Sequence, residues 1–223
     1  MRRYVRPLVG LLVCVVLLLF LPAGTWAWPR GWLFVTVFMG VAVLSLVILQ
    51  RINPEVLVAR SRVFGKGTKS WDAILVSFLI PAVAAILPVA ALDDGRFHWF
   101  PVPWWICGLG YVLFLAGFGG SVWAEAVNKF AEPSVRIQTD RGHTVISSGP
   151  YAIVRHPLYA ASFVLVGGTA LSLGSLWALI PAAVAAALLI VRTRWEDRTL
   201  QAELPGYKEY AERVRFRLIP GVW

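Results

Sequence analysis

Two separate stretches of the sequence carry side chains that could hold a charged ligand. The first is GPYAIVRHPLY at residues 149–159, and the second is RTRWED at residues 192–197. Their ionisable and phenolic side chains include Arg155, His156, Tyr159, Arg192, Glu196 and Asp197. Such groups are costly near a bilayer unless they are paired or used, so they form a candidate functional site. A structural belt, in which an arginine pairs with Glu196, explains the same spacing equally well.

A helical hairpin must bring these two stretches together. Pro157 suits the first turn of a helix, and a long apolar run follows it. Glycine and serine residues interrupt that run, which predicts two helices over about 157–172 and 175–195. The second helix then returns to the level at which the first began. Arg192 and Glu196, four residues apart, share one face of it.

The rest of the sequence predicts an integral membrane protein. Of its 223 residues 58% are hydrophobic and 15% are charged, whereas about a quarter are charged in soluble domains. A helix needs about 20 apolar residues to cross ~30 Å of hydrocarbon. Further segments of this kind are 8–28, 31–50, 72–92 and 104–123. With the hairpin, we expect a single all-α domain of about six transmembrane helices.

Two long segments lie outside the expected helices of the membrane. Within residues 124–157, the stretch VRIQTDRGHTVISSGPY alternates and contains turn residues, which predicts an extended or irregular loop. The tail 192–223 begins as a continuation of the last membrane helix. Leu204-Pro205-Gly206 should break that helix, and a short amphipathic helix is expected over about 206–214.

The distribution of basic residues predicts the topology. All but two of the 21 lysines and arginines lie in the N-terminal arm, the loop 51–70, the segment 124–157 or the tail from 192, the exceptions being Arg30 and Arg96. Basic loops favour the cytoplasmic side. Both termini and the polar stretches should therefore face the cytoplasm, in a cytoplasmic membrane of the bacterial type. The net charge of +9 then reflects topology and membrane lipids, and no nucleic-acid partner is expected.

Several other chemistries lack their sequence signatures. The histidines are His98, His143 and His156, with no HExxH spacing, and Cys14 and Cys107 lie within apolar runs. We therefore expect no metal site. The phosphate-binding patterns GxGxxG and GxxxxGK[ST] and the hydrolase pattern GxSxG do not occur.

Motifs in the C-terminal part of the chain resemble the isoprenylcysteine carboxyl methyltransferase family, and more loosely the membrane phospholipid methyltransferases. They are GPYAIVRHPLY before the hairpin, RTRWED after it and GYKEYAERVRFRLIP in the tail. The resemblance runs from Asn128 onward, and the earlier spans carry no signature. It implies a membrane methyltransferase that uses S-adenosylmethionine and releases S-adenosylhomocysteine.

The resemblance also assigns residues. It implies a cytoplasm-facing cofactor pocket within 124–223 and leaves 1–123 as a four-helix membrane region of uncertain role. The cofactor-binding residues by similarity are Gln138, His143, Thr144, Val145, Ile146, Tyr151, His156, Pro157, Leu158, Tyr159 and Glu196. Arg192 matches a family arginine near the methyl acceptor. Arg192 and Glu196 are therefore the expected catalytic residues.

The methyl acceptor is expected to be a lipophilic small molecule or lipid that arrives from the bilayer. Arg192 could orient an acceptor carboxylate, which favours O-methylation. An amine or a thiol acceptor stays open. Two other functions also stay open: an NADPH-dependent membrane reductase of a sterol-like enone, and a non-catalytic lipid-binding membrane scaffold.

Overall fold

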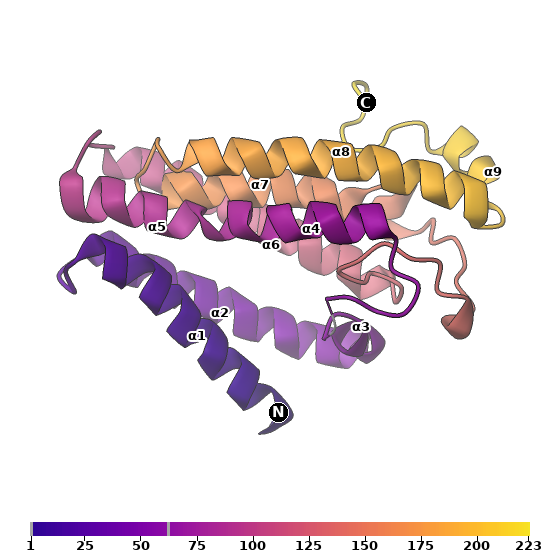
Figure 1. Ribbon diagram of the computed structural model, residues 1–223, viewed down its shortest axis with the longest axis horizontal. Helices are drawn as coiled ribbons and strands as arrows, with labels where there is room; N and C mark the ends of the chain where they lie inside the picture. Colours follow the sequence, from indigo (N-terminus) through magenta and orange to yellow (C-terminus); the bar gives the residue numbers. More distant parts are fainter. Residues whose placement is uncertain (1, 62) are drawn as a thin grey trace. The chain divides into compact units, whose positions relative to one another are not determined.

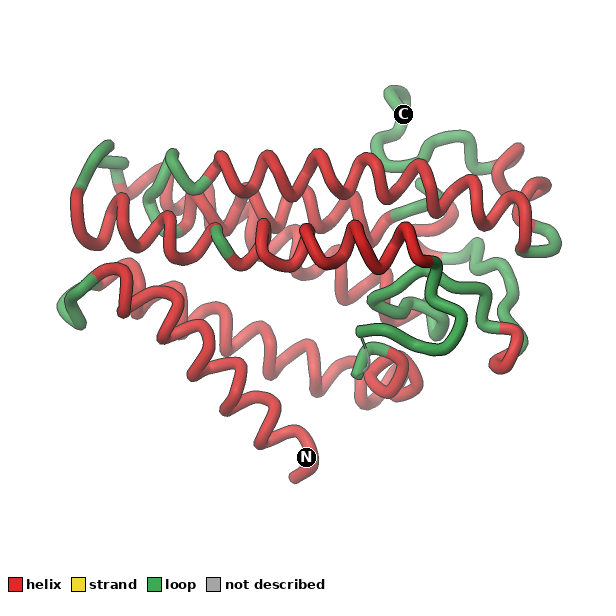
Figure 2. The backbone as a smooth tube through the Cα atoms, in the orientation of Figure 1, coloured by secondary structure: helices red, strands yellow, loops and turns green. Residues whose placement is uncertain are grey.

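The fold is entirely helical over the residues that the computed structural model describes, which are 2–61 and 63–223. Long helices joined by loops and short helical turns account for this part of the chain, and no strand occurs in it (Figures 1 and 2). The predicted all-α class is therefore confirmed.

The expected spans before the hairpin all form helices. Helix α1 covers Arg2–Ala23, and α2 covers Pro29–Ile52. Helix α4 (Ser70–Ala84) continues through α5 (Ile86–Ala90) and the π-helical segment η1 (Ala91–Phe97), and α6 covers Trp104–Val127. Among the described residues, four helices are long and apolar enough to cross a membrane: Tyr4–Ala23, Pro29–Ile52, Ser70–Phe97 and Trp104–Val127.

The hairpin forms as predicted, with one shifted boundary. Helix α7 (Pro157–Ser172) and helix α8 (Leu179–Glu203) run side by side (Figure 1). The predicted start of the second helix at 175 is wrong, because Ser175 belongs to the connecting turn. Its hydroxyl accepts a hydrogen bond from the Ala178 amide at 3.0 Å and donates one to Asp93 at 2.6 Å.

Short elements complete the chain. Helix α3 covers Pro54–Ala59, and the 3-10 turns η2 (Thr139–Arg141) and η3 (Gly149–Ala152) interrupt an otherwise irregular loop after α6. Helix α9 covers Tyr207–Arg213, as the tail sequence predicts. Gly206, before it, has φ 80°, a left-handed conformation that glycine adopts readily.

Contacts divide the chain into two compact units. Unit 1 comprises Met1–Leu46, Ile80–Ala116 and Val164–Ala185, and unit 2 comprises Val47–Leu79, Gly117–Phe163 and Ala186–Trp223. The polar stretches of interest belong to unit 2. The predicted boundary at residue 123 divides the chain by function and not by contacts, so it stays a prediction.

Unit 1 pairs the basic residue Arg30 within its own structure. The Arg30 guanidinium donates hydrogen bonds to Asp94 and, at 2.6 Å, to the Val102 carbonyl, while Trp28 Nε1 donates to Asp94 at 2.7 Å. An arginine outside the basic loops is thus neutralised by a neighbouring carboxylate.

Candidate functional site

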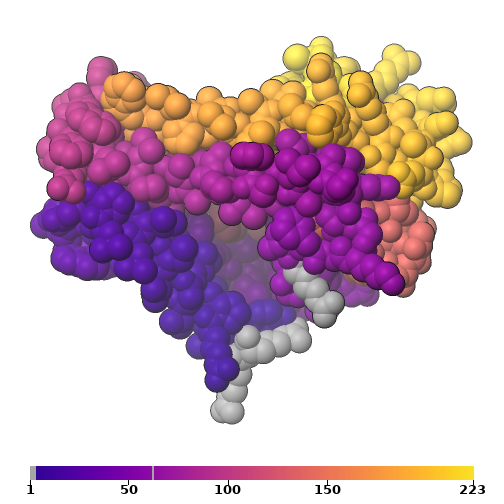
Figure 3. All heavy atoms as spheres, in the orientation of Figure 1, coloured from indigo at the N-terminus to yellow at the C-terminus, as the bar shows by residue number. Residues whose placement is uncertain are grey.

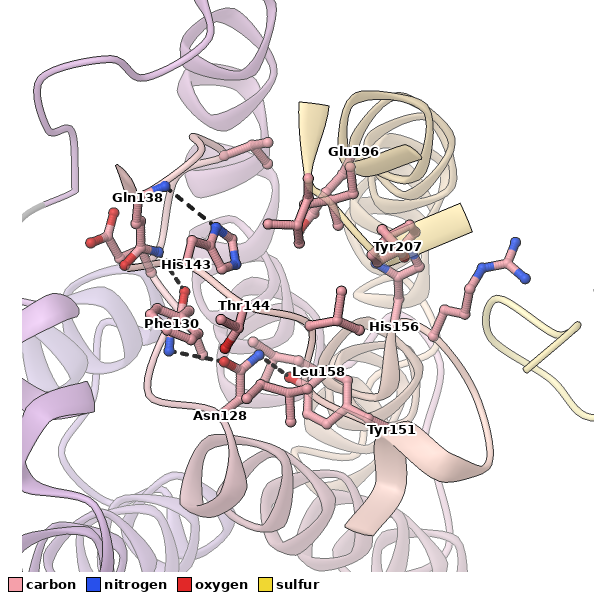
Figure 4. A pocket seen from close by; sticks show the side chains of 18 of the residues that line it. Asn128, Phe130, Gln138, His143, Thr144, Tyr151, His156, Leu158, Glu196 and Tyr207 are labelled. Atoms are coloured by element: carbon pink, nitrogen blue, oxygen red, sulfur yellow. Dashed lines mark hydrogen bonds between the residues drawn. The ribbon is translucent and has the colours of Figure 1, made fainter. Parts of the chain in front are cut away.

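A pocket in unit 2 gathers most of the residues that the resemblance assigns to the cofactor (Figure 4). The predicted residues in its wall are Gln138, His143, Thr144, Val145, Ile146, Tyr151, His156, Leu158, Tyr159 and Glu196. Pro157 and Arg192 are not part of the lining. Their proposed roles in binding and catalysis stay predictions, but the tertiary fold does bring residues from distant segments to one cavity.

The hairpin is what brings the two polar stretches together. Tyr159, in the first turn of α7, donates its hydroxyl hydrogen to the Glu196 carboxylate on α8. His156 Nε2 lies 3.3 Å from Asp197 Oδ1. The predicted return of the second helix to the level of the RHP sequence is therefore confirmed.

Asp197 is the centre of a buried ionic cluster beside the pocket. Its side chain is 0% exposed and receives both Nε (2.8 Å) and Nη2 (3.1 Å) of Arg155, together with Arg217 Nε at 2.8 Å. Tyr207 Oη donates to it at 3.2 Å. Burial alone would raise the pKa of Asp197, but hydrogen bonds from His156 and Arg155 outweigh it and hold that pKa well below its usual range.

The Glu196 carboxylate faces the pocket, because the nearby arginines pair with other carboxylates. The belt alternative pairs Arg155 or Arg192 with Glu196, and this is wrong because Arg155 pairs with Asp197 and Arg192 with Asp72. Within the described part of the chain, no ion pair involves Glu196. The Glu196 carboxylate accepts the Tyr159 hydroxyl. Its side chain lines the cavity (Figure 4).

Arg192 occupies a different position from the one expected of an acceptor-binding group. It is 6% exposed, and its Nε and Nη2 bind the two oxygens of Asp72 at 2.7 and 3.2 Å. Nη2 also donates to the Pro133 carbonyl at 2.5 Å. The guanidinium carbon lies 5.3 Å from the centre of the Tyr159 ring. Arg192 thus contacts the pocket residue Tyr159 but does not itself line the cavity.

The loop after α6 forms the opposite wall. The Gln138 side chain donates to the Phe130 carbonyl at 2.7 Å and accepts Arg141 Nη1 at 2.7 Å, so both ends of its amide are used within the protein. His143 Nδ1 accepts the Gln138 amide at 3.3 Å, and its ring centre lies 4.6 Å from that of Phe130. Burial lowers the pKa of His143 to about 4, so the ring is neutral at pH 7.

Some lining residues were not predicted as site residues. Asn128 Nδ2 donates to the Tyr151 hydroxyl at 2.9 Å, and Tyr210 Oη donates to the Tyr151 carbonyl at 2.7 Å. Tyr207 also lines the pocket, and burial raises the pKa of both tail tyrosines. Their Y-x-x-Y spacing was the available signal, because it places both rings on one face of α9. Asn128 had no comparable signal.

The tail after α9 holds the RHP turn in place. The amides of Arg155 and His156 donate to the carbonyls of Phe216 and Arg217, each at 2.9 Å. Leu218 is buried in an apolar cluster that includes Tyr159. This tail contacts α8 through Arg217 and Asp197 and through Trp223 and Arg194, and the space-filling view shows yellow C-terminal atoms beside the orange atoms of α8 (Figure 3). These amides are therefore committed to the fold and do not face a ligand.

The shifted pKa of His143 predicts a pH dependence of stability. The unfolded chain protonates this histidine below its ordinary pKa of 6.5, whereas the native protein resists protonation down to about 4. The free energy of unfolding should therefore fall as the pH drops from 6.5 to 4, by about 1–2 kcal/mol after allowance for partial exposure. Thermal unfolding of the protein and of His143→Gln across this range tests it. Equal slopes for both proteins would contradict the prediction.

Comparison with known proteins agrees with the motifs. Residues 103–202 match the model of the isoprenylcysteine carboxyl methyltransferase (ICMT) family. The resemblance predicted from the motifs is confirmed. The matched range contains α6, the pocket loop, α7 and Glu196, and it ends at residue 202, before the tail motif. The expectation that the spans before Asn128 carry no family signature is therefore wrong for α6.

A curated relative extends over part of the chain. The cobalt-zinc-cadmium resistance protein CzcN of Cupriavidus metallidurans is 37% identical over 139 residues. The match covers 59% of this chain and 58% of CzcN, so the chain spans well under two thirds of that relative's length.

Proposed function

We propose that this protein is an integral membrane methyltransferase that moves a methyl group from S-adenosylmethionine to a lipophilic acceptor. One observation carries the proposal: the Glu196 carboxylate, held by Tyr159 and free of an ion pair among the described residues, faces a cavity lined mostly by the region that matches the ICMT family. The pocket and both termini would face the cytoplasm.

The chemistry of the lining fits this cofactor. The Glu196 carboxylate suits the positive charges of the sulfonium and amino groups, and the rings of Tyr151 and Tyr159 can pack on a sulfonium or a purine. Leu158 and Leu200 supply apolar surface for the base. The cavity measures about 100 Å³, below the ~300–1,000 Å³ of typical small-molecule sites, so binding requires side chains of the wall to move apart.

The protein's part in catalysis would be binding and alignment. When bound, the cofactor supplies an already activated methyl group. Holding donor and acceptor in line can contribute roughly 7–11 kcal/mol to barrier lowering at best. Glu196 would hold the amino group or offset the positive charge, and the Tyr159 hydroxyl would keep its carboxylate oriented. The neutral His143 ring adds no opposing charge to the wall.

The acceptor would reach the site from the bilayer. A carboxylate remains a candidate from the family resemblance, with an amine or a thiol as the other candidates. The pairing of Arg192 with Asp72 removes the structural reason for preferring a carboxylate.

Ligand-dependent melting tests the proposal. S-adenosylhomocysteine should raise the melting temperature of the purified protein in detergent, and NADPH should not. With radiolabelled S-adenosylmethionine, label should appear in total membrane lipid. Stabilisation by NADPH alone would support the reductase, and no response to either ligand would support the scaffold.

A further inference from the structure

Part of the pocket wall is held by a segment from the N-terminal region. Ser134 and Val135 line the pocket, and each is 5% exposed. The Ser134 hydroxyl lies 3.0 Å from the Thr68 hydroxyl, and the Lys69 amide donates to the Val135 carbonyl at 3.0 Å. The Val135 amide in turn donates to Asp72 Oδ2 at 2.7 Å. Residues 68–72 therefore fix this stretch of wall through both its backbone and its side chains.

Asp72 connects that wall to α8. Its side chain is 0% exposed, and it accepts two hydrogen bonds from Arg192 in addition to the Val135 amide. Arg192 also donates to the Pro133 carbonyl. Both partners of one buried ion pair thus bind the same short stretch, 133–135, and neither of them lines the cavity.

Arg192, one partner of this ion pair, also contacts a residue that would meet the ligand. The Arg192 guanidinium lies over the ring of Tyr159, whose hydroxyl binds Glu196. A shift of Arg192 would therefore move a wall residue and the support of Glu196 together. Asp72 is the carboxylate that holds Arg192 in this position.

We infer that Asp72 is a positioning residue for the cofactor pocket, acting through Arg192 and the Val135 amide. This inference rests on the proposed function. It gives residues 68–72, which lie before the range that matches the family, a defined part in building the site.

Two variants test the inference. Asp72→Asn leaves Arg192 buried without a counter-charge, so a lower melting temperature is expected together with weaker binding. The double variant Asp72→Leu/Arg192→Met removes both charges and also the oxygen that accepts the Val135 amide, and its melting temperature should recover part of the loss. In this double variant the Val135 amide still lacks its hydrogen bond to residue 72. The affinity for S-adenosylhomocysteine should therefore stay about tenfold or more below that of the wild type.

A second readout needs no cofactor. Hydrogen–deuterium exchange of a peptide covering 133–136 should be faster in the ligand-free double variant than in the ligand-free wild type, because the Val135 amide has lost its carboxylate acceptor. Asp94→Asn is the matched control. It breaks the Arg30–Asp94 pair of unit 1, so it should lower the melting temperature without changing affinity or the exchange of 133–136.

Failure of the inference about Asp72 and failure of the proposed function give different results. If the wild type binds and the double variant binds equally tightly with unchanged exchange, Asp72 only stabilises the fold and the inference is overturned. If the wild type fails to bind S-adenosylhomocysteine, the proposed function is overturned. In that case the exchange of 133–136 alone decides whether Asp72 holds the wall.

Discussion

Replacing Asp197 by asparagine is expected to destabilise the folded protein by about 3–5 kcal/mol. Asp197 is fully buried and receives Arg155, whose side chain is 6% exposed, and Arg217. An asparagine of the same size cannot neutralise them, so a buried guanidinium would be left without its counter-charge. The measurement is thermal or denaturant unfolding in one detergent, for the wild type and the variant.

The surface pair of Lys69 and Glu203 is the control for this prediction. Its atoms also approach to 2.7 Å, but the side chains are 30% and 44% exposed, so Glu203→Gln should cost at most about 1 kcal/mol. A loss in Asp197→Asn no larger than in this control would show that the cluster around Asp197 contributes little to stability.

Lowering the pH should also destabilise the folded protein, because it protonates Asp197 in this cluster. The folded-state pKa of Asp197 lies below its usual range. The stability that this carboxylate provides is therefore fully present at any pH above the ordinary pKa of a carboxyl group. That stability is lost as the pH falls below the ordinary pKa of about 4 toward the folded-state value.

The sequence predicted the helices well because they depend on local signals. Apolar length marks α1, α2, α4 and α6, and Pro157 marks the start of α7. The late start of α8 could not be read from these signals. It depends on a hydrogen bond of Ser175 to Asp93, a residue 82 positions away in the sequence.

The pairing of charges was less predictable than their position. Spacing on α8 placed Arg192 and Glu196 on one helix face and suggested that they pair. In the structure Arg192 binds Asp72, 120 residues earlier, in the first turn of α4. Such a partner follows only from tertiary packing, and no local pattern around Asp72 indicates it. The motif spacing of Tyr207 and Tyr210, by contrast, reflected a shared face of α9.

Replacing Glu196 by glutamine is expected to lower the affinity for S-adenosylmethionine roughly 10- to 100-fold, the range for losing a hydrogen bond to a charged group. Glutamine keeps the length of the side chain and an oxygen that can accept the Tyr159 hydroxyl. Glu196 makes no ion pair among the described residues, so melting temperature and expression should stay close to those of the wild type. Isothermal titration in detergent measures the affinity directly.

A comparison of two ligands identifies what Glu196 faces. S-adenosylmethionine carries a sulfonium charge, whereas S-adenosylhomocysteine has a neutral thioether and keeps the amino group. A larger loss for the former would place the carboxylate near the sulfonium, and equal losses would place it near the amino group. Unchanged affinity for both ligands in Glu196→Gln, with Glu203→Gln as the matched surface control, would remove Glu196 from the site. Because the substitution changes charge and little else, a loss of binding isolates the electrostatic contribution of this carboxylate.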